Sequence, residues 1–205
     1  MLWDFVNWAD LTEMHAMGAV VGGKPLPSPD QTPQPSPAPT PAPKPEPTPK
    51  PEPAPKPGRN AVTNGGFEDG QAPWQGNQNR VNTNQAQPAR TGKGKLWLGG
   101  VGRANKTYMG QKVTVPANGT LTFWVHVDTD ETEGRAFDTA RGDLVDDNGA
   151  GPVLVRLSNL DAKDGYQKRT VDLSKFAGRN MWLRFAAFED GNTRSGFVFD
   201  DVSIA

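Results

Sequence analysis

The most constraining feature of this chain is the distribution of its prolines. Sixteen of the 20 prolines lie between Pro25 and Pro57, where most alternate with Ala, Lys, Glu, Thr and Ser. This composition leaves the stretch without a set of apolar side chains that could form a core. The folded part of the chain is therefore predicted to span the 146 residues from Asn60 to Ala205, a common size for one domain.

The amino-terminal segment, residues 1–23, is predicted to be a short helix. Its apolar residues have a spacing compatible with an amphipathic helix: Leu2, Phe5, Val6, Ala9, Leu11, Met14 and Met17. A helix of this length is marginally stable by itself in water. We interpret the segment as the remnant of an upstream domain; a disordered leader is the alternative.

Residues 24–59 are predicted to form a disordered proline-rich linker. Alternating prolines favour the extended polyproline II conformation, also in the residue that precedes each proline. At about 3.1 Å per residue, the segment would span on the order of 100 Å as a semi-rigid spacer. A peptide ligand for proline-binding domains is the alternative, but alternating Lys and Glu suit a stalk better.

The charge and residue content of the folded segment exclude several classes of partner. Residues 60–205 contain 17 Lys and Arg and 17 Asp and Glu, which argues against a nucleic-acid-binding surface. The chain has no cysteine, so no disulfide framework is possible. No apolar run is long enough to span a membrane, and the acidic amino terminus lacks the basic region of a signal peptide.

The folded segment is predicted to be all-β. Strand-like runs bounded by Gly, Asn and Asp clusters occur at residues 95–98, 108–115, 120–128, 153–157, 168–173, 181–188 and 197–204. In the third run, Leu121, Phe123 and Val125 alternate with Thr122 and Trp124. Such alternation indicates antiparallel strands in a two-sheet sandwich, with the aliphatic faces turned inward.

Three stretches of the folded segment resemble jelly-roll carbohydrate-binding modules. They are NGGFEDGQAPW (64–74), ARTGKGKLWLGG (89–100) and GFVFDDVSIA (196–205). The intervening LTFWVHVDTDETEGRAFDT and YQKRTVDLSKFAGRNMWLRFAAFED are similar to calcium-assisted β-sandwich modules appended to secreted bacterial hydrolases and peptidases. The resemblance implies a two-sheet antiparallel jelly-roll β-sandwich.

The resemblance also implies a structural Ca²⁺ ion. In modules of this type, the Glu of the opening motif and an Asp of the closing motif hold calcium together with main-chain carbonyls. Transferred by position, the ligands would be Glu68 and Asp201 or Asp200, hard oxygen donors that suit Ca²⁺. Turn capping or pairing with an arginine is the alternative role of these carboxylates.

A second acidic cluster lies between Asp128 and Asp147. Eight acidic residues occur there against only Arg135 and Arg141, and this much like charge in one loop is costly without a counterion or full solvation. Ion binding by Asp128, Glu131 and Asp138 is one interpretation. A solvated loop is the other, because the spacing lacks an EF-hand pattern.

Aromatic residues on the outer strand faces are candidate sugar platforms. A pyranose packs its C–H face on an aromatic ring while nearby polar groups bond its hydroxyls. The alternation pairs Trp124 with His126, Trp182 with Arg184, and Trp97 with a lysine. Tryptophans on an outer face are also often covered by a loop, and Trp74, after its Gly and Pro turn, is expected to plug one end of the sandwich.

The sequence predicts a binding module and not an enzyme. The acids gather in turns and one loop, with no sign of a pair facing across a cleft, and His126 has no nucleophile motif for a partner. We expect a secreted accessory module that binds a polysaccharide or cell-wall glycan and tethers an upstream enzyme to it. The alternative is a structural or protein-interaction domain of a secreted peptidase, without glycan affinity.

Overall fold

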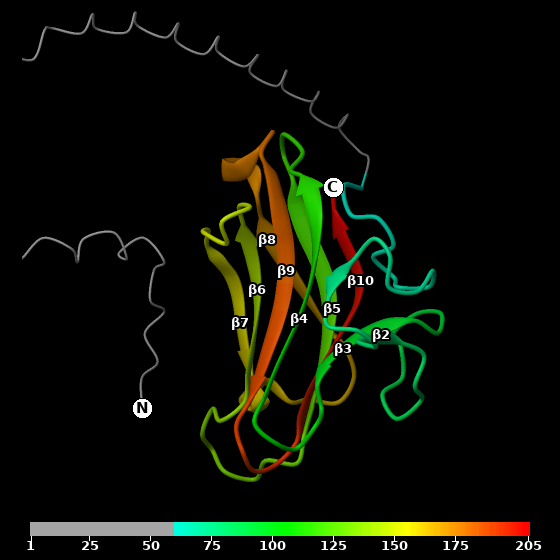
Figure 1. The fold of residues 1–205 in the computed structure, drawn as a ribbon, viewed down its shortest axis with the longest axis vertical. Coiled ribbons are helices and arrows are strands. Elements are labelled where there is room, and N and C mark those ends of the chain that lie inside the picture. The colour runs from blue at the N-terminus through cyan, green and yellow to red at the C-terminus, as the bar shows by residue number, and fades with distance from the viewer. Residues whose placement is uncertain (1–59) are drawn as a thin grey trace, which may run out of the picture. The chain divides into compact units, whose positions relative to one another are not determined.

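A computed structural model describes residues 60–205 of the chain. The predicted helix at residues 1–23 and the proline-rich linker at residues 24–59 lie outside the described residues. The described part is a sandwich of two five-stranded sheets, seen as two layers in Figure 1. All of the strand pairs are antiparallel, so the predicted all-β jelly-roll sandwich is confirmed.

The strands fall into two sheets that we call sheet A and sheet B. Sheet A has the order β1 (Gln75–Gly76), β4 (Asn105–Thr114), β9 (Asn180–Glu189), β6 (Thr139–Val145) and β7 (Val153–Ser158). Sheet B has the order β2 (Val81–Asn82), β3 (Lys95–Gly99), β10 (Ser195–Ile204), β5 (Thr120–Thr129) and β8 (Gln167–Asp172). Two 3₁₀ turns complete the fold, η1 (Asn159–Asp161) and η2 (Ser174–Phe176).

The core lies between the two sheets and is built from the alternating apolar positions. Phe123 of β5, Phe185 of β9 and Phe199 of β10 are fully buried, with ring centroids 4.5–5.9 Å apart. Burying each such side chain contributes about 1.5–3 kcal/mol. Trp74 is also buried, 5.2 Å from the ring of Phe67, as expected for a residue that plugs the sandwich.

The opening motif closes the sandwich against the end of β10. The Asn60 side chain accepts hydrogen bonds from the amides of Val62 and Ile204. A Cβ at Gly65 would lie 1.8 Å from the carbonyl oxygen of Val202, so glycine is required there by close backbone approach and not by a positive φ. Between residues 64 and 67 the positive φ angles belong instead to Asn64 and Phe67, at 52° and 59°.

The seven predicted strands are all present, but the acidic segment 128–147 is not one loop. It contains β6, which the sequence analysis missed because Gly142 and Asp143 interrupt its apolar alternation. Asp143 is 2% exposed and is paired with Arg141 and Arg184. Asp143 is typical of a loop in the sequence, but it is tolerated in the middle of a sheet because Arg141 and Arg184 neutralise its charge.

Candidate functional site

The predicted calcium ligands Glu68, Asp200 and Asp201 all contact the segment between β2 and β3. Both carboxylate oxygens of Glu68 accept from the amide of Lys93, and one also accepts from Gly94. Asp201 pairs with the guanidinium of Arg90 and accepts from the hydroxyl of Thr91. These carboxylates hold the loop that leads into β3.

Asp200 is fully buried at the centre of this arrangement. One of its oxygens accepts from the amides of Arg90 and Thr91 at 2.8 and 3.1 Å, and the other accepts from the amide of Asp201 at 2.8 Å. Burial raises the pKa of the Asp200 carboxyl to about 6, although the amide hydrogen bonds oppose this shift. Burial likewise lowers the pKa of Lys95, which Asp200 partly counteracts.

The fit of this group to calcium is limited by the existing contacts. Main-chain amides, the Thr91 hydroxyl and the Arg90 guanidinium already engage the carboxylates. Within residues 60–205, Glu68, Asp200 and Asp201 do not form a group whose oxygens converge on one point. The turn-capping and arginine-pairing role is what the geometry displays, and calcium binding by these residues stays a prediction.

The predicted platform Trp124 lies on the outer face of sheet B, under a covering cation. The guanidinium of Arg90 lies 3.8 Å from the ring centroid of Trp124. His126, on the same face, bonds through Nδ1 to the carbonyl of Gly165 and lies 5.7 Å from the ring of Tyr166. These contacts cover part of the Trp124 and His126 surface, and both side chains are half-buried.

Trp97 occupies a second, separate position on the outer face of sheet B. Its indole packs against the backbone of Gly100 and Gly196, where added Cβ atoms would lie 2.6 and 2.8 Å from Nε1. The neighbouring Lys95 is fully buried and donates to the carbonyl of Asn84. Trp97 lines a small groove of about 260 Å³ with Arg80, and the lysine is withdrawn from it.

Trp182 and Arg184 are brought together on the outer face of sheet A. The strand register places Gly110 of β4 and Asp143 of β6 on either side of Arg184. Both side chains line a groove of about 350 Å³. Its other lining residues are Gln75, Gly76, Tyr108, Gly110, Val145, Asp146, Asp147 and Gly149.

Polar contacts fix the two predicted side chains in this groove. The indole Nε1 of Trp182 donates to Asp147 at 2.9 Å, and Asp147 also accepts from Lys112 at 2.8 Å. Arg184 donates to Asp143 at 2.8 Å. An aromatic surface is thus bordered by an arginine, a lysine and carboxylates, which can donate to and accept from hydroxyl groups.

Tyr108 is a groove residue that the sequence analysis did not single out. Its side chain is 44% exposed, an unusual exposure for a large aromatic residue in this domain. The signal was present in the sequence, because Tyr108 alternates with the buried Thr107 and Met109 on β4. It therefore belongs to the same outward set of β4 as Lys112.

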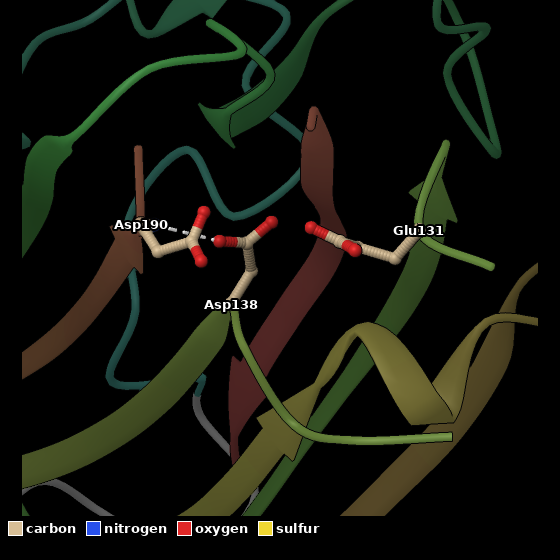
Figure 2. Close-up of side chains that lie close together, drawn as sticks. All are labelled: Glu131, Asp138 and Asp190. Atoms are coloured by element: carbon tan, nitrogen blue, oxygen red, sulfur yellow. Dashed lines mark hydrogen bonds between the residues drawn. The ribbon is translucent and has the colours of Figure 1, made fainter. Parts of the chain in front are cut away.

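The structure brings together Glu131 and Asp138 of the second acidic cluster and adds Asp190 to them. Figure 2 shows Asp138 between Glu131 and Asp190, with the three carboxylates facing one another. Their oxygens lie within 4.8 Å of one another. Asp128 does not take part, because it pairs with Arg194 at 2.7 Å and accepts from Gln87.

Comparison with known proteins finds related segments and folds. No protein-family model matches the chain. Two hemagglutinin A proteins of Porphyromonas gingivalis, one of them from strain ATCC BAA-308 / W83, are 31% identical over 109 residues and 35% identical over 92 residues. These segments cover 46% and 38% of this chain, which spans about 4% of the length of either relative.

Among solved structures, the carbohydrate-binding module TmCBM61 in complex with β-1,4-galactotriose is similar in fold. It has a TM-score of 0.52 and 20% identity, over 72% of this chain and 98% of the module. The K3 cleaved adhesin domain of the Lys-gingipain of P. gingivalis W83 has a TM-score of 0.49 and 16% identity, over 72% of this chain and 99% of that domain. The similarity to TmCBM61, together with the two antiparallel sheets, shows that residues 60–205 have the β-sandwich fold of a jelly-roll carbohydrate-binding module.

Proposed function

We propose that residues 60–205 form a non-catalytic module that binds a carbohydrate polymer on the outer face of sheet A. The observation that supports this proposal is the groove of about 350 Å³ in which Trp182 and the exposed Tyr108 lie beside Arg184. Aromatic rings can pack on the C–H faces of sugars, and the arginine and the carboxylates can bond hydroxyl groups. The similarity in fold to a module solved with β-1,4-galactotriose supports the ligand class.

The groove on sheet A is a better candidate than the surface around Trp124. Arg90 covers the Trp124 ring, and His126 is engaged by Gly165 and Tyr166. Trp182 and Tyr108, in contrast, line an open groove. We therefore move the proposed platform from Trp124 to these two residues, and keep Arg184 as a polar contact.

A panel of insoluble polysaccharides and cell-wall preparations tests this function. The full chain is expected to be retained on at least one glycan and to be released by the matching soluble oligosaccharide. Tyr108→Ala should weaken the measured affinity by about fivefold or more, since truncating an aromatic ring that contacts the ligand costs on the order of 1 kcal/mol or more. Trp124→Ala, on the opposite sheet, is the matched control and should bind as the unaltered chain does.

The similarity to hemagglutinin A segments favours a second function, an adhesin or interaction module without glycan affinity. This alternative predicts the same fold but no retention on any member of the polysaccharide panel. Retention that Tyr108→Ala and Trp182→Ala leave intact would instead place the glycan elsewhere on the module. The two results separate failure of the function from failure of the assigned surface.

We further propose that the proline-rich residues 24–59 act as a spacer that tethers an upstream catalytic domain to the glycan, outside the cell. A spacer converts binding of the module into a raised effective substrate concentration for the attached domain. Within residues 60–205 the structure has no helix with the length and hydropathy that a membrane crossing requires. The genomic sequence upstream of Met1 tests the tether, because an open frame that encodes a hydrolase or peptidase is expected there.

A further inference from the structure

Three carboxylates at one end of the sandwich flank three different strands. Glu131 lies two residues after β5, Asp138 directly precedes β6, and Asp190 directly follows β9. In Figure 1 the connections that carry them meet at the lower end of the sandwich. We propose that Glu131, Asp138 and Asp190 bind a Ca²⁺ ion, at a position distinct from that of Glu68 and Asp200.

Two carboxylate oxygens of this cluster are buried without a hydrogen-bond partner. Asp138 is fully buried; its Oδ1 accepts from the amide of Asp190 at 2.8 Å, whereas its Oδ2 has no partner. Oε1 of Glu131 is likewise buried and unpartnered. An unsatisfied buried carboxylate is costly, so these two oxygens point to a ligand that bonds them.

No side-chain cation compensates the cluster within the described part of the chain. None of the ion pairs among residues 60–205 includes Glu131, Asp138 or Asp190. Three facing carboxylates in a partly buried position repel one another unless a positive charge lies between them. A divalent cation supplies that charge.

Other buried acids in the same protein are satisfied differently. Glu189, next to Asp190 in sequence, accepts from the amides of Val101 and Gly102. Asp143 is paired with the guanidinium groups of Arg141 and Arg184. Asp143 also has one buried oxygen, Oδ1, without a hydrogen-bond partner, but its two guanidinium groups compensate its charge. The cluster at Asp138 differs because its two unpartnered oxygens belong to carboxylates that take part in none of the ion pairs among residues 60–205.

The cluster is held in place before any ion binds. Asn159 of η1 accepts from the amides of Phe137 and Asp138 and donates to the carbonyl of Arg135. The amide of Glu131 donates to the Thr129 hydroxyl. A rigid arrangement of ligands lowers the entropic cost of cation binding.

The chemistry of the cluster selects Ca²⁺ among common cations. All three ligands are hard oxygen donors, and Ca²⁺ takes six to eight oxygens at about 2.3–2.6 Å, so oxygens up to roughly 5 Å apart can share one ion. The oxygens of this cluster lie within 4.8 Å of one another. Mg²⁺ demands near-ideal octahedral geometry and usually keeps several waters, whereas Ca²⁺ accepts an irregular oxygen shell. Water and main-chain carbonyls would complete the calcium shell here.

Such an ion would connect the two sheets. Glu131 follows a strand of sheet B, while Asp138 and Asp190 flank two paired strands of sheet A. The opposite end of the sandwich is already closed by the bonds between Asn60 and Ile204. The cation would link the two sheets at the other end of the sandwich.

Calcium titration of the EDTA-stripped full chain by calorimetry tests the proposal. Glu131→Gln is expected to remove one binding event or to weaken its Kd by about tenfold or more. Asp130→Asn is the matched control in the same loop: it removes an adjacent, exposed charge that pairs with Arg194, and its calcium binding should be unchanged. Unaltered calcium stoichiometry and affinity in Glu131→Gln would overturn the proposal.

Thermal unfolding gives a second readout: the difference in melting temperature between Asp138→Asn and the unaltered chain should change sign between EDTA and calcium. In EDTA, Asp138→Asn should unfold at a temperature equal to or above that of the unaltered chain, because it removes one of three repelling charges. In saturating calcium it should unfold at a lower temperature, because it gains nothing from the ion. If Asp138→Asn does not fold, the same comparison is made with Glu131→Gln.

A Glu68→Gln variant separates this site from the one predicted at the opening motif. Under the proposal, calcium still raises the melting temperature of Glu68→Gln and does so less or not at all for Glu131→Gln. If the calcium-dependent rise in melting temperature is lost in Glu68→Gln and kept in Glu131→Gln, the ion binds at the opening motif and the proposal is wrong.

Discussion

The guanidinium carbon of Arg90 lies 3.8 Å from the ring centroid of Trp124. The same arginine pairs with Asp201, the residue that follows the buried Asp200 of β10. Arg90, in the loop that precedes β3, therefore contacts both the ring of Trp124 on β5 and the carboxylate of Asp201 on β10. This one side chain covers part of the Trp124 ring, the strongest candidate for a sugar platform in the sequence.

Replacing Arg90 with Ala is expected to lower the free energy of unfolding by about 1–2 kcal/mol. The change removes a cation–π contact worth about 0.5–2 kcal/mol and a partly exposed ion pair worth about 1 kcal/mol or less. Urea unfolding measures the difference. Arg103→Ala, which removes an exposed arginine, is the control and should change stability by less than about 0.5 kcal/mol.

A double-mutant cycle of Arg90→Ala and Trp124→Ala isolates the contact between the two side chains. The coupling energy should be at least about 0.5 kcal/mol. Strictly additive effects would show that Arg90 acts only through Asp201.

The sandwich was predictable from the sequence because strand alternation is local information. The alternation of Leu121, Phe123 and Val125 within one strand is enough to predict that these side chains are buried, without knowledge of the rest of the chain. The exposure of an outer face is not local: Arg90 reaches Trp124 from 34 residues away, and Tyr166 reaches His126 from 40 residues away. The sequence could therefore name Trp124 and Trp182 as candidates but could not tell which one a loop covers.

The same distinction applies to the acidic cluster. The sequence could assign Glu131 and Asp138 to one segment because they are neighbours along the chain. Asp190 lies beside them because β9 pairs with β6. Asp128 lies outside the cluster because it pairs with Arg194 instead. Both facts depend on pairings between residues far apart in sequence, 37–49 positions in the β6–β9 pairing and 66 positions between Asp128 and Arg194.

Gly65→Ala is expected to destabilise the sandwich by about 1–3 kcal/mol, the usual cost of overpacking. An added Cβ would lie 1.8 Å from the carbonyl oxygen of Val202, whose amide bonds Gly65 at 2.9 Å. Calorimetric melting measures the loss. Gly134→Ala is the control because its Cβ would meet nothing within 4 Å; an equal loss in both variants would mean that the close approach to Val202 is not the cause.

Asp143→Ala is expected to cost about 3–5 kcal/mol, the range found when one partner of a buried ion pair is removed. Asp143 is 2% exposed and faces two arginines, so its loss leaves two partly buried guanidinium groups without their counterion. Asp147→Ala, which removes a carboxylate that is 67% exposed and paired with Lys112, should destabilise the protein far less, because solvent screens an exposed ion pair. Urea unfolding of both variants tests the contrast.

Asp200 predicts a pH dependence of stability with a definite sign. Burial raises the pKa of its carboxyl from 3.8 to about 6 in the folded protein. Between these values the folded state binds more protons than the unfolded chain, so the contribution of Asp200 to the free energy of unfolding falls as the pH rises from about 4 to above 6. At 1.36 kcal/mol per pKa unit, the loss is on the order of 3 kcal/mol.

Asp200→Asn lacks this titration and isolates it from that of the other carboxyl groups. The stability of Asp200→Asn relative to the unaltered chain should therefore improve on going from about pH 4 to about pH 7.5, by up to roughly 3 kcal/mol. Urea unfolding of both proteins at the two pH values, in EDTA so that no cation competes for the carboxylate, measures the change. A stability difference that stays constant with pH would show that Asp200 ionises in the folded protein as it does in the unfolded chain, and that its three amide donors fully offset its burial.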